Sequence, residues 1–283
     1  MPARRLLLQQ AIQAASELRD ATGFDQFGPA DPYAAAERLG VKVVFLGASM
    51  EGFYFKGSPA RILLSTLRPV PRRTFTCAHE LGHHWFGHGS TIDQLQEDER
   101  LDSNKPDEIL ANGLAAFFLM PTVGLRGAFA RRGWNMATAS ALQLFIVSCE
   151  FGVGYQTLLN HITYSLREIS ASRKEELEKW TPQRIRRKIL NDDYDSLIIV
   201  DAHSKSPTFD VEKGAAVLLP ISDASDNNTL NHVKSLPDYE VYHAAKRGIA
   251  SINGAARTYA IRVMPKPYEG AAKNRFLEDP DEN

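Results

Sequence analysis

Apolar residues follow a helical period at the start of the chain and then give way to short strand-like runs. Between residues 4 and 21 they recur every three or four positions, which predicts an amphipathic helix. A second helix is expected at residues 31–40, because Asp31 can cap its first turn and Gly40 is a common helix stop. Three β-rich runs follow at residues 41–46, 52–56 and 60–65. The pattern predicts a small sheet packed against helices.

Helical periodicity returns after Pro71 and continues to about residue 191. The predicted helices cover residues 71–86, 107–119, two stretches within 138–166 on either side of "FGV", and a charged region at 172–191. Residues 90–108 are acidic and polar and are expected to form a loop between the first two of these helices.

Strand-like runs dominate the last part of the chain, at residues 196–200, 214–221, 239–245 and 257–264. The sequence therefore predicts an α+β protein of several parts. The expected divisions are a domain at residues 1–125, a helical region at 126–191, a β-rich domain at 192–268 and a mobile tail at 269–283.

Composition narrows the classes of function. The 283 residues include 33 Lys and Arg against 34 Asp and Glu, so a formal net charge of −1 gives no global attraction to nucleic acid or to an anionic membrane. Two cysteines are too few for a disulfide framework, which favours the reducing cytoplasm. The apolar run Leu6–Leu8 is too short for a signal peptide, and we expect no membrane anchor.

The stretch "RRTFTCAHELGHHWFGHG" at 72–89 carries the strongest candidate chemistry. His79 and His83 are four residues apart on the predicted helix, so their directions differ by only about 40° and both imidazoles can bind one ion. Glu80 lies on the flank, where it could contact a water on that ion. The H-E-x-x-H pattern is typical of zinc held by two histidines with the glutamate as general base. The same nitrogen and oxygen donors also accept manganese or iron. The alternative is a histidine-rich turn of an ordinary buried helix.

A catalytic zinc usually has three protein ligands, so a third must lie downstream. The longer metzincin pattern would need glycine at position 86 and histidine at position 89. The chain has Phe86 and Gly89 there, which argues against that subclass. The downstream carboxylates are Asp93, Glu97, Asp98, Glu99, Asp102, Asp107 and Glu108. Glu108 shares a helix face with the apolar residues Ala111 and Leu119, which pack inward, whereas Asp107 points about 100° away.

Other reactive side chains near the motif have ordinary explanations. His84 lies about 100° round the helix from His83, and His88 falls beyond the helix break, so neither is favoured as a ligand. Cys77 points roughly 200° away from His79 and is expected to be a buried, inert thiol. The candidates for stabilising an oxyanion are His84, Arg73 and Tyr155, and for each a structural or solvent-facing role is the favoured interpretation.

Two separated motifs resemble one family of bacterial metallopeptidases. "RRTFTCAHELGHHWFGH", followed by "DEILANGLAAFFLMP" at 107–121, is similar to the ImmA/IrrE group, and the resemblance covers roughly residues 25–125. It implies a zincin-like peptidase domain in which Glu108 completes a zinc site with His79 and His83. It also implies metal-assisted peptide hydrolysis, with Glu80 as the general base.

The resemblance extends more weakly to the rest of the chain. Members similar to IrrE carry a helix-turn-helix after the peptidase, and "LQLFIVSCEFGVGYQTLLNHI" at 142–162 has the required helix, glycine turn and helix. The polar residues that could face DNA are Tyr155, Gln156 and Asn160, with the basic residues Arg184, Arg186, Arg187 and Lys188 nearby. A packed helical unit is favoured over direct DNA binding. A GAF-like sensor domain is the candidate for residues 192–268.

The resemblance also implies the substrate class, a helix-turn-helix transcriptional repressor. Cutting that repressor would derepress genes for stress response or for a mobile element. The alternative is a DNA- or protein-binding regulator in which the zinc is structural. Glu80 favours the enzyme, because a purely structural zinc site has no need of a base at that position.

Overall fold

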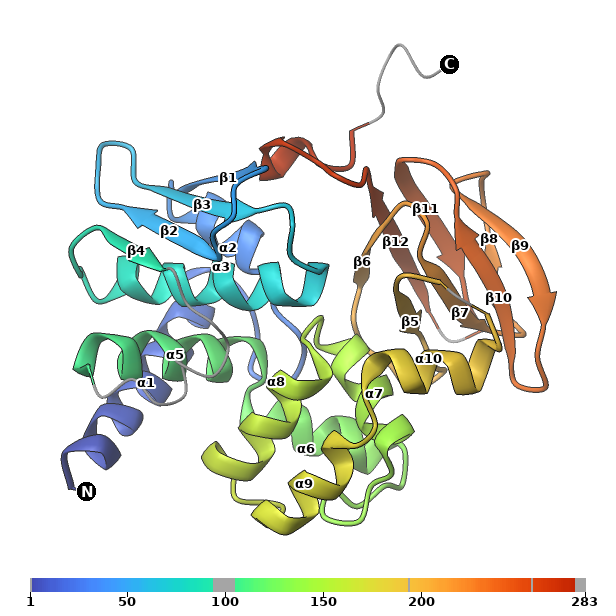
Figure 1. Ribbon diagram of the computed structural model, residues 1–283, viewed down its shortest axis with the longest axis horizontal. Coiled ribbons are helices and arrows are strands. Elements are labelled where there is room, and N and C mark those ends of the chain that lie inside the picture. The colour runs from blue at the N-terminus through green and yellow to red at the C-terminus, as the bar shows by residue number, and fades with distance from the viewer. Residues whose placement is uncertain (1, 94–104, 193, 256, 278–283) are drawn as a thin grey trace. The chain divides into compact units, whose positions relative to one another are not determined.

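The computed structural model describes residues 2–93, 105–192, 194–255 and 257–277 (Figure 1). The described chain divides into two compact units. The first contains the residues up to Gly124 together with Pro267–Arg275, and the second contains Leu125–Lys266 and the residues from Phe276 onwards. Most of the predicted acidic loop at 90–108 lies outside the described residues, including the candidate carboxylates Glu97, Asp98, Glu99 and Asp102.

The first unit is a sheet covered on one face by helices. Its helices are α1 (Pro2–Ala21), α2 (Pro32–Arg38), α3 (Val70–Trp85) and α5 (Pro106–Leu119), and its strands are β1 (Lys42–Leu46), β2 (Gly52–Phe55), β3 (Arg61–Ser65), β4 (Thr91–Asp93) and β13 (Gly270–Ala271). The strand order is β13-β1-β3-β2-β4, with β1 and β3 parallel and the remaining pairs antiparallel. The Asp31 side chain accepts hydrogen bonds from the backbone of Tyr33 and Ala34, which confirms the predicted cap of α2.

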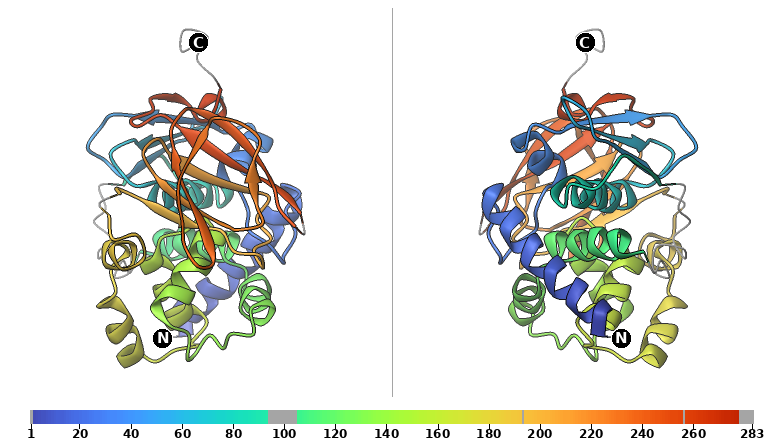
Figure 2. Two further views of the ribbon diagram at one scale, coloured as in Figure 1. Left: turned by 90° about the vertical axis from the view of Figure 1, so that its right-hand side faces the viewer. Right: turned by 90° about the vertical axis from the view of Figure 1, so that its left-hand side faces the viewer.

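Helix α3 is the centre of this unit. It lies between the sheet and α5, and α1 packs on α5 from the other side (Figures 1 and 2). Every residue from Thr76 to His83 is therefore buried, which is why the functional side chains of the motif sit inside the protein. Pro71 stands in the first turn of α3, and Gly87, with φ of +71°, lies just after its end.

The span Pro106–Arg131 is long and apolar enough by composition to cross a membrane, but 67% of its apolar 18-residue window is buried inside the structure. Its first part, α5, packs between α1 and α3. Burial in the core of the first unit accounts for its apolar composition.

Part of the segment predicted as a tail belongs to the first unit. Residues 269–283 were expected to form a mobile tail, yet β13 pairs with β1 through Val44 and Phe45. The ring of Tyr268 contacts that of Phe45, with 5.9 Å between centroids, and the guanidinium of Arg275 lies 4.4 Å from the centre of the Tyr33 ring. A two-residue strand has too little periodicity to be recognised in a segment rich in glycine, proline and charge. Residues 278–283 lie outside the described part.

The second unit combines helices and strands, and its boundary with the first falls inside α6. The helical elements are α6 (Thr122–Arg131), α7 (Ala141–Glu150), α8 (Tyr155–Asn160), a π-helix (His161–Ser165), α9 (Ala171–Glu178) and α10 (Pro182–Leu190). The strands are β5 (Leu197–Ile199), β6 (Thr208–Glu212), β7 (Ala216–Pro220), β8 (Ala224–Ser225), β9 (Leu230–Ser235), β10 (Tyr239–Ala244), β11 (Gly248–Asn253) and β12 (Thr258–Met264).

Helices α7 and α8 form a corner. The chain bends by 104° between Ala141–Glu150 and Tyr155–Ser165, which is within the range of helix-turn-helix units. The polar groups at the start of α8 are engaged: the Tyr155 hydroxyl donates to the Leu177 carbonyl, and the Gln156 amide donates to the Glu178 carboxylate. These contacts anchor α8 to α9 and place an acidic group beside the helix that would face DNA. The expectation that this corner packs as a helical unit and does not bind DNA directly stays a prediction.

The β-rich region forms two four-stranded sheets that share one core. The strand orders are β5-β7-β10-β9 and β6-β12-β11-β8. Buried side chains from both sheets, such as Val217, Leu219, Ile261 and Val263, meet in this core. The predicted β-rich character of residues 192–268 is therefore present, whereas the GAF-like assignment is not confirmed.

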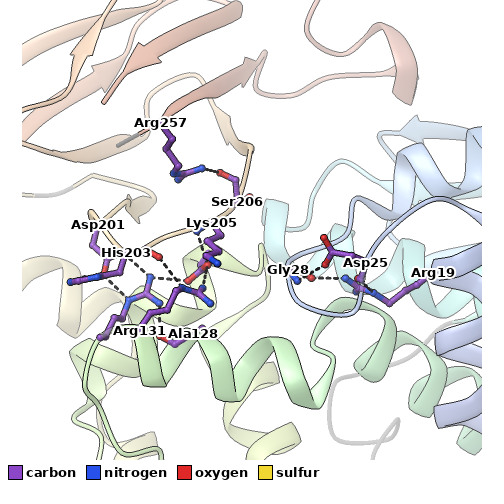
Figure 3. A network of polar contacts seen from close by, with 12 residues as sticks. Arg19, Asp25, Gly28, Ala128, Arg131, Asp201, His203, Lys205, Ser206 and Arg257 are labelled. Carbon is purple, nitrogen blue, oxygen red and sulfur yellow. Dashed lines mark hydrogen bonds and ion pairs between the residues drawn. The ribbon is translucent and has the colours of Figure 1, made fainter. Parts of the chain in front are cut away.

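A buried ion network joins the helices of the second unit to its sheets (Figure 3). The guanidinium of Arg132 contacts Asp201 at 2.6 Å and Glu150 at 2.7 Å, and Arg131 contacts Glu150 at 2.9 Å. Glu150 also accepts a hydrogen bond from the backbone of Lys205. Because these contacts cross the expected division at residue 192, the helical region and the β-rich region form one compact unit.

A second buried arginine holds the first unit together. Arg19 is 0% exposed, and its guanidinium donates to the backbone carbonyls of Phe118, Asp25 and Gly28. Burial lowers the pKa of Arg19 to about 10, with Asp25 and Asp20 opposing the shift, so the side chain is still charged at neutral pH. The cation ties α1 to the end of α5 and to the loop before α2.

Replacing Arg19 by Met should lower the free energy of unfolding of the first unit by about 3 kcal/mol, because three backbone carbonyls, that of Phe118 in a buried bond, each lose a charged donor. Urea denaturation followed by circular dichroism measures this change. The matched control is Arg5→Met, which removes an exposed arginine from the same helix and should change stability by less than about 0.5 kcal/mol. Equal stability of the two variants would contradict the role given to Arg19.

Candidate metal centre

Three side chains from two helices converge inside the first unit. His79 and His83 stand one turn apart on α3, and Glu108 lies in the first turn of α5. The two Nε2 atoms are 3.1 Å apart. The Glu108 carboxylate oxygens lie 3.4 Å from Nε2 of His79 and 3.5 Å from Nε2 of His83. The three residues predicted as ligands are therefore brought together.

These spacings fit a metal ion. Ligands bound tetrahedrally at about 2.1 Å from an ion are separated from one another by roughly 3.4 Å. Both histidines are 0% exposed, and the Glu108 side chain is 13% exposed. Two imidazole nitrogens and one carboxylate, with solvent reaching the carboxylate, form a donor set suited to zinc with a position left for a further ligand. Among the described residues this is the group of His, Cys, Asp and Glu side chains with metal-binding spacing.

The close crossing of α3 and α5 sets this geometry. Gly82 on α3 faces Ala111 on α5, and a Cβ atom at Gly82 would lie only 2.9 Å from the Ala111 Cα. Glu108 stands one turn before Ala111, so the contact between the helices determines how near the carboxylate comes to the histidines. The glycine of the motif therefore has a structural function that any larger residue would disturb.

Glu80 lies beside the ligands, on the side of α3 that faces β2. It is 0% exposed. A Cβ atom at Gly52, the first residue of β2, would lie 2.8 Å from Glu80 Oε1 and 2.5 Å from the Thr76 methyl group. The sheet therefore leaves space for the Glu80 carboxylate only because residue 52 is glycine. Sequence reasoning did not single out Gly52, since a lone glycine at the start of a strand carries no specific signal.

Comparison with protein families matches residues 36–163 to the IrrE N-terminal-like domain, a peptidase family. Residues 36–163 are therefore similar to an IrrE N-terminal-like domain. The match includes β1 to β4, α3 and α5, and continues through the corner formed by α7 and α8. It confirms the resemblance drawn from the two motifs.

Two further comparisons add little. No curated protein matches the chain. A solved structure of a Mycobacterium tuberculosis transcriptional regulator shares 16% identity over 58% of this chain and 52% of its own, with a TM-score of 0.38. The chain thus spans about half the length of that structure, and a likeness at this level supports no inference about fold or activity.

The candidate oxyanion-stabilising residues of the IrrE N-terminal-like domain are engaged elsewhere. His84 Nδ1 lies 3.0 Å from the hydroxyl of Tyr54 on β2. Arg73 is buried with its guanidinium 5.5 Å from the centre of the Phe45 ring, and Tyr155 anchors α8 to α9 in the second unit. Burial also raises the pKa of the Cys77 thiol, as expected of an inert cysteine.

His88 and Asp107 lie closer to the centre than the sequence suggested. His88 Nδ1 lies 2.9 Å from Nδ1 of His83, and His88 Nε2 lies 3.4 Å from an oxygen of Asp107. Burial lowers the pKa of His88, although Asp107 and Glu108 oppose this. The signal that could have located His88 is Gly87, which stops the helix and turns the next residue back onto its last turn.

Replacing Gly82 by Ala should weaken zinc binding by roughly tenfold, because α5 must move and Glu108 moves with it. It should also destabilise the fold by about 1–3 kcal/mol through overpacking, offset in part by the better helix propensity of alanine. Competition with a chromophoric chelator measures the zinc affinity.

The control for this test is Gly127→Ala in α6. There the nearest atom to an added Cβ is the flexible end of Arg131, at 3.3 Å, so zinc affinity should be unchanged. A Gly82→Ala protein that binds zinc as tightly as the unchanged protein would show that the helix crossing does not set the spacing of the ligands.

Proposed function

We propose that this chain is a zinc-dependent endopeptidase that cuts a protein substrate. The observation that carries the proposal is the spacing of His79, His83 and Glu108, which matches three ligands of one tetrahedral ion. Glu80 is buried on the same helix, next to His79 in sequence. The IrrE N-terminal-like domain is a peptidase family, which supports the same conclusion.

His79, His83 and Glu108 would hold the metal. When bound, zinc supplies a Lewis acid that polarises a carbonyl and lowers the pKa of a coordinated water towards neutrality. Manganese or iron would bind to the same donors, and zinc is the choice that two imidazole nitrogens and one carboxylate would favour. Glu80 would accept the proton of the attacking water and pass it to the nitrogen of the leaving amine.

The surroundings of Glu80 suit a base that is held in one position. Thr76 and Gly52 close on the side chain from the helix and from the strand, so few conformations remain open to it. Restricting a catalytic group in this way removes an entropic cost from the reaction. A structural zinc site would not require a buried carboxylate in this position.

We propose a helix-turn-helix transcriptional repressor as the substrate, cleaved once in the cytoplasm. The support for this class is the resemblance of the two motifs to the ImmA/IrrE group, because cleavage of a repressor would join a peptidase to gene regulation. The outcome would be derepression of stress-response or mobile-element genes. The second unit, with its β-rich region, would then serve to regulate the peptidase.

Replacing Glu80 by Gln should lower the rate of cleavage by at least about 100-fold while zinc stays bound, because the amide keeps the shape of the side chain but cannot take a proton. The substrate for the test is a purified helix-turn-helix repressor, for which a small repressor encoded next to this gene would be the candidate. Gel electrophoresis and mass spectrometry measure the rate and the cut site, and chelator competition measures zinc.

Glu37→Gln, an exposed change on α2, is the matched control and should leave both cleavage and zinc affinity unchanged. The catalytic assignment of Glu80 is refuted if its variant cleaves the repressor at the normal rate. Loss of zinc from the Glu80 variant would instead point to a role as ligand.

A further inference from the structure

The metal centre is connected to the protein surface through a second pair of side chains. Nδ1 of His83, the ring nitrogen that faces away from the three ligand atoms, lies 2.9 Å from Nδ1 of His88. The other ring nitrogen of His88, Nε2, lies 3.4 Å from Oδ1 of Asp107. His83, His88 and Asp107 therefore form a continuous polar chain, which we call the histidine relay.

The helix stop builds this relay. After α3 ends, Gly87 takes φ of +71°, and the backbone of His88 donates to the carbonyl of His83 at 3.0 Å. Phe86 stacks on the imidazole of His88 with an angle of 18° between the rings and 5.6 Å between their centres. The turn and the stacked ring hold His88 in place against His83.

Hydrogen-bond chemistry gives the relay a direction. A metal-binding Nε2 must offer its lone pair, so the proton of neutral His83 belongs on Nδ1 and is donated to an acceptor. His88 Nδ1 can accept it only if the proton of His88 lies on Nε2, where it faces the Asp107 carboxylate. In the reverse arrangement His83 would carry its proton on Nε2, directed at His79 and Glu108, and could not bind a metal.

We propose that His88 and Asp107 are positioning residues that fix the metal-binding tautomer and the ring orientation of His83. Partners of this kind on the outer nitrogen of a ligand histidine typically change metal affinity by about 10–100-fold. The usual partner is a carboxylate or a backbone carbonyl, whereas here a second imidazole stands between the ligand and the carboxylate.

The relay also links the two helices that supply the ligands. Asp107 and Glu108 are neighbours in the first turn of α5. When α5 packs on α3, one residue completes the ligand set and the other reaches His88. The packing of α5 on α3 thus brings in the third ligand and also selects the tautomer of His83. This inference rests on the metal centre of the proposed function, but not on peptide cleavage.

The test is the zinc affinity of the full chain, measured by chelator competition after zinc is removed and added back. His88→Phe keeps an aromatic ring for Phe86 to stack on but removes the acceptor, and it should weaken zinc binding by about 10–100-fold. His88→Gln offers an amide oxygen to His83 and should recover most of the affinity. Asp107→Asn should cause a smaller loss, because the side chain of Asp107 is 64% exposed.

The matched control is His84→Phe. His84 is half-buried on the same helix and contacts Tyr54, so its removal should change zinc affinity by less than about threefold. In the cobalt-substituted protein, the visible absorption bands should shift in His88→Phe and stay unchanged in His84→Phe, because only the first alters the geometry of a ligand.

The possible results separate the relay from the peptidase. If His88→Phe binds zinc like the unchanged protein, the relay has no role in positioning His83. Equal losses in the Phe and Gln variants would also overturn the proposal, because they would show that the ring matters only for packing. An unchanged protein that binds no zinc would overturn the relay and the proposed function together. Normal zinc binding with the expected losses, but without cleavage of any repressor, would overturn only the proposed function.

Discussion

The metal centre depends on one contact, the close approach of two helix backbones where Gly82 meets Ala111. Two histidines on a single helix are placed by helix geometry alone, but the third donor comes from a helix more than twenty residues further along the chain. Its position is set by how near α5 can come to α3. A methyl group at residue 82 is enough to change that distance, so the spacing of the three donors follows from the absence of a side chain.

A glycine also allows a close contact on the other face of α3. The sheet lies against the helix at Gly52, whose missing side chain leaves room for the carboxylate of Glu80 and the methyl group of Thr76. Helix α3 is thus enclosed by a strand on one side and a helix on the other, and both contacts are made by glycine. A buried helix that carries His79, Glu80 and His83 is polar where a core is normally apolar, and a bound cation would provide the compensation that buried polar groups need.

Part of this arrangement could be predicted from the sequence and part could not. The helix at 71–86, the strands before it and the choice of Glu108 followed from periodicity and from which helix faces are apolar, because these signals are local. The positions of His88 and Asp107 depend on how the chain turns after Gly87 and on where α5 docks, which are tertiary features. The buried network around Arg132 and Glu150 was missed for the same reason, since its members are far apart in sequence and join regions that composition separates.

The strand β13 shows how far tertiary contacts can override sequence order. The first unit takes most of its residues from the first 124 of the chain, yet the edge of its sheet beside β1 is covered by residues 270–271. During synthesis the edge of β1 would stay open until residues 270–271 have left the ribosome, and an open edge readily pairs with other strands. The sheet of the peptidase domain would therefore be completed only after residues 270–271 are synthesised. A nascent or truncated chain without them would be more prone to aggregate than the folded protein.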